Sequence, residues 1–198
     1  MKKYIAISLL ILVMACPAHA WWTIGRTGGR VAGGTENLGR EAAGGSDAGG
    51  ADGYMYCYKL EETPTSNGSV DSITTTLACP GSTCDYYLSI YNHDAVNDLP
   101  STVLANSSTA KKQVSEGPSD LTNTYSAPKP AVTSGTQYWL CVSIDGTTAN
   151  ARYYYSDTGG TAVVFKAIAS GTFPDWAGST DFTSANRWFG KLYIVNSW

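Results

Sequence analysis

Histidine is almost absent from this sequence: His19 and His93 are the two histidines among 198 residues. Catalytic triads, zinc sites and haem attachment depend on histidine together with partner residues at fixed spacing. The sequence also contains no Gly-x-Ser-x-Gly, His-Glu-x-x-His or Cys-x-x-Cys-His motif. We interpret His93 as a solvated loop histidine. A glycosidase needs only two carboxylates, but no pair stands out, so we expect a protein that is not an enzyme.

Charged residues are scarce as well, at 15% of the chain, and the 13 basic residues are outnumbered by 16 acidic ones. The resulting net charge of −3 argues against a nucleic-acid partner, because phosphate binding requires a basic surface. No apolar run reaches the roughly 20 residues that a membrane-spanning helix requires. No run of twelve residues shows a helical period with caps. The sequence therefore predicts no transmembrane segment and few helices.

Residues 1–20 have the pattern of a bacterial-type signal peptide. A positively charged start precedes the apolar run Tyr4–Cys16, and Ala18–Ala20 supplies the small-x-small site that signal peptidase requires. We expect cleavage after Ala20 and an exported protein, either extracellular or at the cell surface. Cleavage would remove Lys2 and Lys3 and no acid, which moves the net charge from −3 to −5.

A lipid anchor is the alternative to cleavage after Ala20. Val13–Cys16 resembles a lipobox, in which Cys16 would be acylated and become the first residue of the mature chain. In that case the protein would be anchored at the cell surface.

The stretch from residue 21 to residue 52 is dominated by glycine. Eleven of the 29 residues from Gly25 to Gly53 are glycine, and large apolar side chains are nearly missing after Val31. Such a segment buries too little surface to offset its backbone entropy, so we expect residues 21–52 to be flexible. The apolar start Trp21–Ile24 could still add a strand to a neighbouring copy.

Four cysteines remain after residue 20: Cys57, Cys79, Cys84 and Cys141. In an oxidising compartment they predict two disulfides, with three pairings open. We favour Cys79–Cys84 and Cys57–Cys141, because the Pro-Gly turn between Cys79 and Cys84 brings those two residues together.

Residues 53–198 consist of short β-rich runs separated by turn residues, which predicts a single antiparallel two-sheet β-sandwich of about nine strands. The continuous apolar run Trp139–Val142 is typical of a central strand covered on both faces. The expected strands are Tyr54–Leu60, Ser69–Leu77, Tyr86–Tyr91, Thr102–Ala105, Thr122–Ser126, Gln137–Ile144, Ala151–Tyr155, Ala162–Ile168 and Arg187–Asn196.

Three stretches of this region resemble a jelly-roll-like module of bacterial secreted and surface-anchored proteins and of phage tail and fibre proteins. They are Leu88–Tyr91 followed by Leu99–Ala105, the hairpin Val132–Val142 (VTSGTQYWLCV), and Arg152–Gly160 with Phe173–Asp175 beyond it. Their order matches that of the module. The resemblance implies a jelly-roll-like sandwich that presents or recognises something outside the cell, and it carries no catalytic residues.

The loop after Tyr91 is rich in oxygen ligands. Asn92, Asp94 and Asp98 could bind Ca²⁺ together with a backbone carbonyl, and calcium is the one cofactor that this sequence suggests. Asn and Asp also populate turns for backbone reasons, so an ordinary turn is the competing interpretation.

Aromatic residues mark a second candidate site. Tyr153 and Tyr155 would share one face of a strand, and with Asp157 and Trp176 they could form a platform for stacking on a sugar ring. Ordinary core packing is the competing interpretation.

Two functions are consistent with these features. The first is a non-enzymatic recognition or adhesion module that binds an extracellular glycan or another surface polymer. The second is a structural subunit of an extracellular fibre or coat, in which Trp21–Ile24 docks onto a neighbouring copy to form a homo-oligomer or filament.

Overall fold

The structure is a computed structural model that describes residues 33–42, 46–49, 53–145, 151–156, 163–169, 171–176, 182–184, 188–189 and 191–198. At 46–48, 153–156, 182–184 and 188–189 only the backbone is described. The expected signal peptide, the lipobox with Cys16 and the segment Trp21–Ile24 lie outside the described residues. All described residues belong to one compact unit, Gly33–Trp198.

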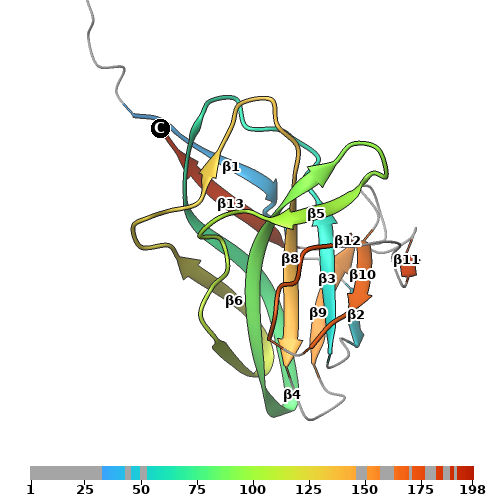
Figure 1. Ribbon diagram of the computed structural model, residues 1–198. Coiled ribbons are helices and arrows are strands. Elements are labelled where there is room, and N and C mark those ends of the chain that lie inside the picture. Colours follow the sequence, from blue (N-terminus) through green and yellow to red (C-terminus); the bar gives the residue numbers. More distant parts are fainter. Residues whose placement is uncertain are drawn as a thin grey trace, which may run out of the picture. The chain divides into compact units, whose positions relative to one another are not determined.

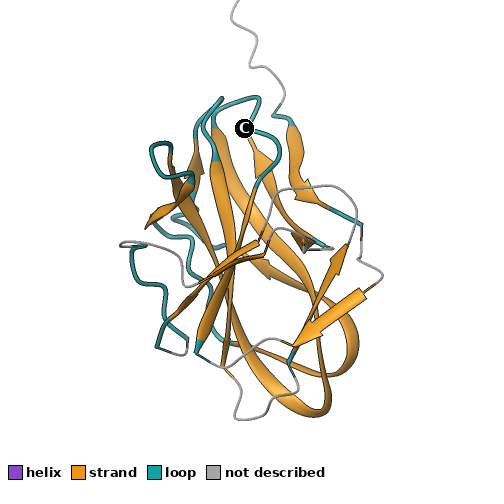
Figure 2. Ribbon diagram, turned by 90° about the vertical axis from the view of Figure 1, so that its right-hand side faces the viewer, coloured by secondary structure: helices purple, strands orange, loops and turns teal. Residues whose placement is uncertain are grey.

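The described part of the chain is all-β, as the sequence predicts, and its strands pair antiparallel in one curled sheet (Figure 2). None of the described residues form a helix that is long and apolar enough to cross a membrane. The strands are β1 (Thr35–Arg40), β2 (Ser46–Gly49), β3 (Tyr54–Lys59), β4 (Gly68–Asp94), β5 (Leu99–Val103), β6 (Lys112–Thr124), β7 (Ala131–Val132), β8 (Tyr138–Asp145), β9 (Arg152–Ser156), β10 (Val163–Ala167), β11 (Phe182–Ser184), β12 (Trp188–Phe189) and β13 (Leu192–Ser197).

One strand, β4, organises this sheet. It is 27 residues long and pairs with β5, β6, β7, β8, β9 and β13. Its first limb, residues 69–75, pairs with β13, and its second limb, residues 85–92, pairs with β8. β6 pairs with both limbs, so β4 and β6 form a long ribbon along which the sheet curls (Figure 1).

The sequence predicted two strands, Ser69–Leu77 and Tyr86–Tyr91, where the structure has the single strand β4. The pairing with β6 continues across the expected turn, because Cys79 faces Glu116 and Thr83 faces Ser115, with the ladder irregular between them. The Cys79–Cys84 disulfide closes this irregularity. The Pro-Gly sequence therefore makes a bulge within a strand and does not end the strand.

Alternation along the strands produces two hydrophobic clusters. In β8, Leu140 and Val142 belong to the larger cluster, which also takes residues from both limbs of β4. Trp139 and Cys141, on the opposite face of β8, belong to the smaller cluster. This arrangement explains why Trp139–Val142 is a continuous apolar run. The register of β3 and β8 places Cys57 opposite Cys141, and these two residues form the second predicted disulfide.

Two strands, β1 and β2, lie within the segment up to residue 52 that the composition predicts to be flexible, and they pair with β13 and β9. In β1, Leu38 is 2% exposed and joins the larger cluster, so one leucine provides the burial that the composition seemed to exclude. Gly39, at φ +112, allows the close approach, because a Cβ there would lie 2.5 Å from the Leu192 carbonyl oxygen.

Glu36 attaches β1 to the loop before β4. Its carboxylate accepts hydrogen bonds from Thr65 Oγ1 (2.6 Å), the Thr65 backbone N–H (3.1 Å) and Asn196 Nδ2 (2.8 Å). Burial acts to raise the pKa of Glu36, but the bonds from Thr65 and Asn196 outweigh it and hold the pKa below its usual value. The ionised carboxylate is therefore favoured in the folded state.

We expect Glu36→Gln to weaken the acid sensitivity of the fold. A depressed pKa contributes stability above the ordinary glutamate value of 4.5, and this contribution is lost as the pH falls through the folded-state pKa. The variant should be less stable than the wild type at neutral pH and should lose less stability below about pH 4.5. Denaturant unfolding followed by tryptophan fluorescence at pH 7 and pH 3 measures both effects. Glu61→Gln, at an exposed position, is the matched control, and equal pH profiles for both variants would contradict the assignment.

Candidate polar groove

A groove of about 460 Å³ opens between two segments that flank β6. One wall is formed by residues 106–112 and the other by residues 122–126, and we call the space between them the polar groove. Its lining residues are Asn106, Ser108, Thr109, Ala110, Lys112, Thr122, Asn123, Thr124, Tyr125 and Ser126. Hydroxyl and amide side chains predominate in this set, and it contains no carboxylate, histidine or cysteine.

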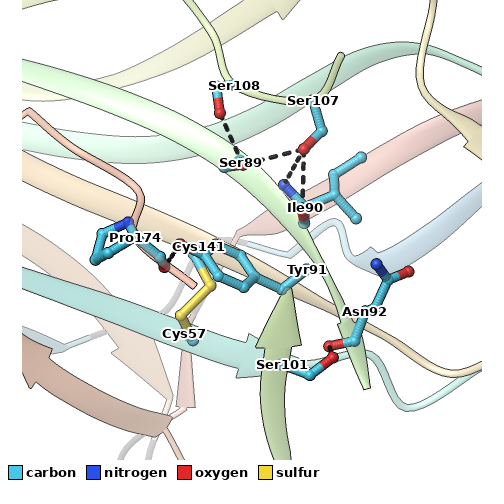
Figure 3. Close-up of a disulfide and its surroundings, with 10 residues drawn as sticks. All are labelled: Cys57, Ser89, Ile90, Tyr91, Asn92, Ser101, Ser107, Ser108, Cys141 and Pro174. Carbon is cyan, nitrogen blue, oxygen red and sulfur yellow. Dashed lines mark hydrogen bonds between the residues drawn. A yellow bond between two sulfur atoms is a disulfide. The ribbon is translucent and has the colours of Figure 1, made fainter. Parts of the chain in front are cut away.

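Hydroxyl side chains attach the first wall to the second limb of β4, and Figure 3 shows the serines among them. Ser107 Oγ donates to the Ile90 carbonyl (2.9 Å) and accepts from the Ile90 N–H (3.1 Å). Thr109 Oγ1 accepts from the Leu88 N–H, and the Thr109 N–H donates to the Leu88 carbonyl, both at 2.9 Å. Side chains thus replace part of a β ladder, which fixes this wall without making it a strand.

The second wall is fixed at the end of β6. The Thr122 hydroxyl contacts that of Thr74 at 2.9 Å, and the Tyr125 N–H donates to the Asp71 carbonyl at 2.8 Å. The Tyr125 hydroxyl then crosses to the first wall and donates to the Ser107 carbonyl at 2.7 Å. Burial raises the pKa of Tyr125, so this phenol stays protonated and remains a donor. One hydrogen bond therefore joins the two walls.

Asn123 is the one lining side chain that combines burial with an unused polar atom. Asn123 is 4% exposed, and its Nδ2 has no hydrogen-bond partner in the described structure. The amide lies beside Tyr86. Burial raises the pKa of Tyr86, and the Asn123 side chain lowers this pKa in part. Nδ2 and the phenol oxygen nevertheless do not have the geometry of a hydrogen bond. A buried donor without a partner costs about 1–3 kcal/mol, and Nδ2 has less than 1 Å² of accessible surface, so an acceptor reaches it only if the side chains around it move.

Each of the three residues predicted to bind calcium interacts with a different partner within the protein. Asn92 donates to Thr102 Oγ1 at 2.9 Å, while Asp98 forms an ion pair with Lys59 at 2.5 Å. Asp94 accepts from the Val96 N–H (2.9 Å) and from Asn97 Nδ2 (2.7 Å), and the Asn97 side chain is the main cause of its lowered pKa. Each of these three side chains thus has a partner within the protein, and the hydrogen bonds of Asp94 are those of an ordinary turn, while a calcium site here stays a prediction.

The interpretation of His93 as a solvated loop histidine is wrong. Its side chain is 16% exposed and its ring stacks on Trp139, whose Nε1 donates to His93 Nδ1 at 3.1 Å. With Nδ1 accepting, the proton of a neutral ring lies on Nε2, which is 3.8 Å from Asp98 Oδ1. The lone pair that a general base would use is therefore already occupied.

Most of the predicted aromatic platform lies outside the part of the chain that the structure describes. The side chains of Tyr153 and Tyr155, and the whole of Asp157, lie outside the described part of the chain. Trp176 is 7% exposed and belongs to the smaller cluster, with Lys166 Nζ 5.5 Å from its ring centroid. Trp176 is therefore a core residue and offers no exposed stacking surface.

Sequence reasoning missed the groove because its residues carry no motif. Two signals were available: the polar run Asn106–Thr109 directly after a predicted strand, and the predicted strand Thr122–Ser126, which has polar residues on both faces. A strand with so few apolar side chains is poorly explained by packing alone, and such a strand is a reason to look for a site.

No family model matches this chain, and no curated protein matches it. Among solved structures, the chain is similar to the clostridial cysteine protease Cwp84 after propeptide cleavage, with a TM-score of 0.51 and 15% sequence identity. The match covers 82% of this chain, which spans 40% of the length of that protein. At this identity the similarity concerns the fold alone.

We expect Tyr125→Phe to loosen the groove. The variant keeps the ring but leaves the Ser107 carbonyl without its donor, which should lower the free energy of unfolding by about 1 kcal/mol. Amide hydrogen exchange in residues 106–110 should accelerate, because the bond that joins the walls is lost. Tyr193→Phe, at a partly exposed position outside the groove, is the control. Unchanged exchange in Tyr125→Phe would show that the bond does not hold the walls together.

Proposed function

We propose that this protein is a non-enzymatic recognition module that binds a glycan, or a similar polyhydroxylated surface polymer, in the polar groove. The observation that carries the proposal is the lining of the groove, in which hydroxyl and amide side chains predominate and no carboxylate is present. A sugar offers many hydroxyl groups, which can pair with the hydroxyls of Ser108, Thr109 and Thr124.

The dimensions and chemistry of the groove support a glycan over an apolar ligand. Small-molecule sites typically enclose about 300–1,000 Å³, and the volume of about 460 Å³ falls in this range. The lining contains a single buried aromatic, Tyr125, whose hydroxyl is already used within the protein. An apolar ligand would therefore leave many hydroxyl groups without partners, which is costly.

Binding without catalysis is part of the proposal. General acid–base or nucleophilic chemistry needs a titratable group within reach of the ligand, and Lys112 is the one charged side chain that lines the groove. His93, the one histidine within the described residues, accepts a hydrogen bond from Trp139. Trp139 lies on the face of β8 opposite to Leu140.

The same proposal includes the finer architecture, a jelly-roll-like sandwich of two sheets formed from the two limbs of β4. The larger hydrophobic cluster supports it, because Val70 and Ile73 of the first limb and Leu88 and Ile90 of the second meet in one core. The two disulfides fit an oxidising compartment, which is consistent with action outside the cell.

The proposal is tested by blocking the groove without disturbing the core. Wild-type protein is screened on a glycan array, and the best ligand is then titrated calorimetrically. Thr124→Trp places a large ring at an exposed lining position and should weaken binding roughly tenfold or more, which corresponds to about 1.4 kcal/mol.

Thr136→Trp, equally exposed but outside the groove, should bind like the wild type. The absence of any glycan ligand on the array, or equal binding by Thr124→Trp and the wild type, would sink the proposal.

A further inference from the structure

The outer edge of β1 presents backbone groups that pair with none of the described residues. Among the described strands, β1 pairs with β13 alone. The Trp198 N–H donates to the Gly34 carbonyl, and this bond sets which residues of β1 point toward β13. Because the direction of hydrogen bonding alternates along an antiparallel pair, the even-numbered residues of β1 bond to β13. The N–H and C=O of Thr35 and Asn37, two exposed residues, therefore point away from β13.

Two other strand edges within the described residues are protected. At the edge of β5, the Trp176 N–H donates to the Ser101 carbonyl at 2.6 Å, so another segment covers this edge. The Asp175 carboxylate also accepts from the N–H of Val103 at 3.2 Å. The edge of β6 is interrupted by Pro118 and by an irregular ladder. In contrast, β1 contains no proline or lysine and pairs without a register shift, and an edge of this kind is a template for a further strand.

A second copy of this chain is the partner that the charges of β1 fit. Glu36 lies near the start of β1 and Arg40 at its end, on the same face of the strand. When two β1 strands pair antiparallel, Glu36 of each copy lies toward Arg40 of the other copy. Opposite charges on neighbouring strands stabilise such a pair, and two-fold symmetry repeats the contact. An in-register parallel pair would instead place like charges side by side.

We infer that β1 is a dimerisation edge, at which the β1 strands of two copies pair antiparallel through Thr35 and Asn37 and join their sheets into one. This inference goes beyond glycan binding and does not depend on it. In each copy, the first limb of β4 pairs with β13 on one side and with β6 on the other. The polar groove therefore lies on the far side of β4 from β1. The dimer presents two such grooves, and two linked sites bind a polymer with higher avidity than one.

The experiment measures the mass of the full-length chain by sedimentation velocity and the protection of its amides by hydrogen exchange. The wild type should be dimeric at about 100 μM, which corresponds to a Kd below this concentration. The Asn37 amide should gain protection as the protein concentration rises, because its N–H finds an acceptor only in the dimer. The Leu38 amide bonds to β13 and should be protected at every concentration.

Asn37→Pro and Asn37→Thr form a matched pair at one exposed position. Proline removes the outward N–H without removing a bond to β13, and edge strands tolerate it. This variant should raise the Kd of the dimer at least about tenfold, whereas threonine keeps the N–H and should dimerise like the wild type. Asn37→Lys places two ammonium groups at the interface without changing the backbone. Unfolding curves check the fold of each variant, and Asn37→Lys decides the question if Asn37→Pro does not fold.

Each outcome bears on the inference. A dimer that Asn37→Pro and Asn37→Lys weaken and Asn37→Thr retains supports it. A wild type that stays monomeric at about 100 μM overturns it. A dimer of equal strength in all three variants overturns it as well, because the contact then belongs to another surface. Protection of the Asn37 amide that is independent of concentration also overturns it, because another segment of the same chain then covers the edge of β1.

Discussion

The pairing of β4 with six other strands is the constraint on which the rest of this structure depends. Because side chains alternate along a strand, a shift of one residue in this ladder would move Ile73, Leu88 and Ile90 out of the core together. The partners of β4 come from nearly the whole described chain, from β5 to β13. Strands that follow β4 by up to a hundred residues are thereby held in a single register.

The polar groove is a consequence of the same ribbon. β6 follows both limbs of β4, and the segments at its two ends, 106–112 and 122–126, become the groove walls. Each wall is attached to a different limb, through Ser107 to Ile90 and through Tyr125 to Asp71. The distance between the walls is therefore set by how β4 curls. An unused donor at Asn123 can persist because the surrounding hydrogen bonds fix the walls independently of it.

The sequence predicted the parts of this molecule that depend on local chemistry. Alternation and turn residues located β3, β8, β9 and β10 to within one or two residues, and the Pro-Gly turn pointed to the Cys79–Cys84 pair. The continuity of β4 could not be predicted, because it depends on β6 pairing across Cys79 and Thr83. β1 was missed for a similar reason. Leu38 pairs with Ile194, and Glu36 accepts a hydrogen bond from Asn196, and these partners lie some 160 residues later in the sequence. The groove residues are ordinary polar residues, and only the fold makes them neighbours.

The central claim is that the groove between residues 106–112 and 122–126 is where a glycan binds. The most direct measurement is an NMR titration of isotopically labelled protein with the tightest-binding oligosaccharide of the glycan array. The account predicts that the largest amide and side-chain shifts fall on these two segments, with the Asn123 side-chain NH₂ signals among them. Shifts confined to Asn92–Asp98, or to the surroundings of Lys166 and Trp176, would contradict it.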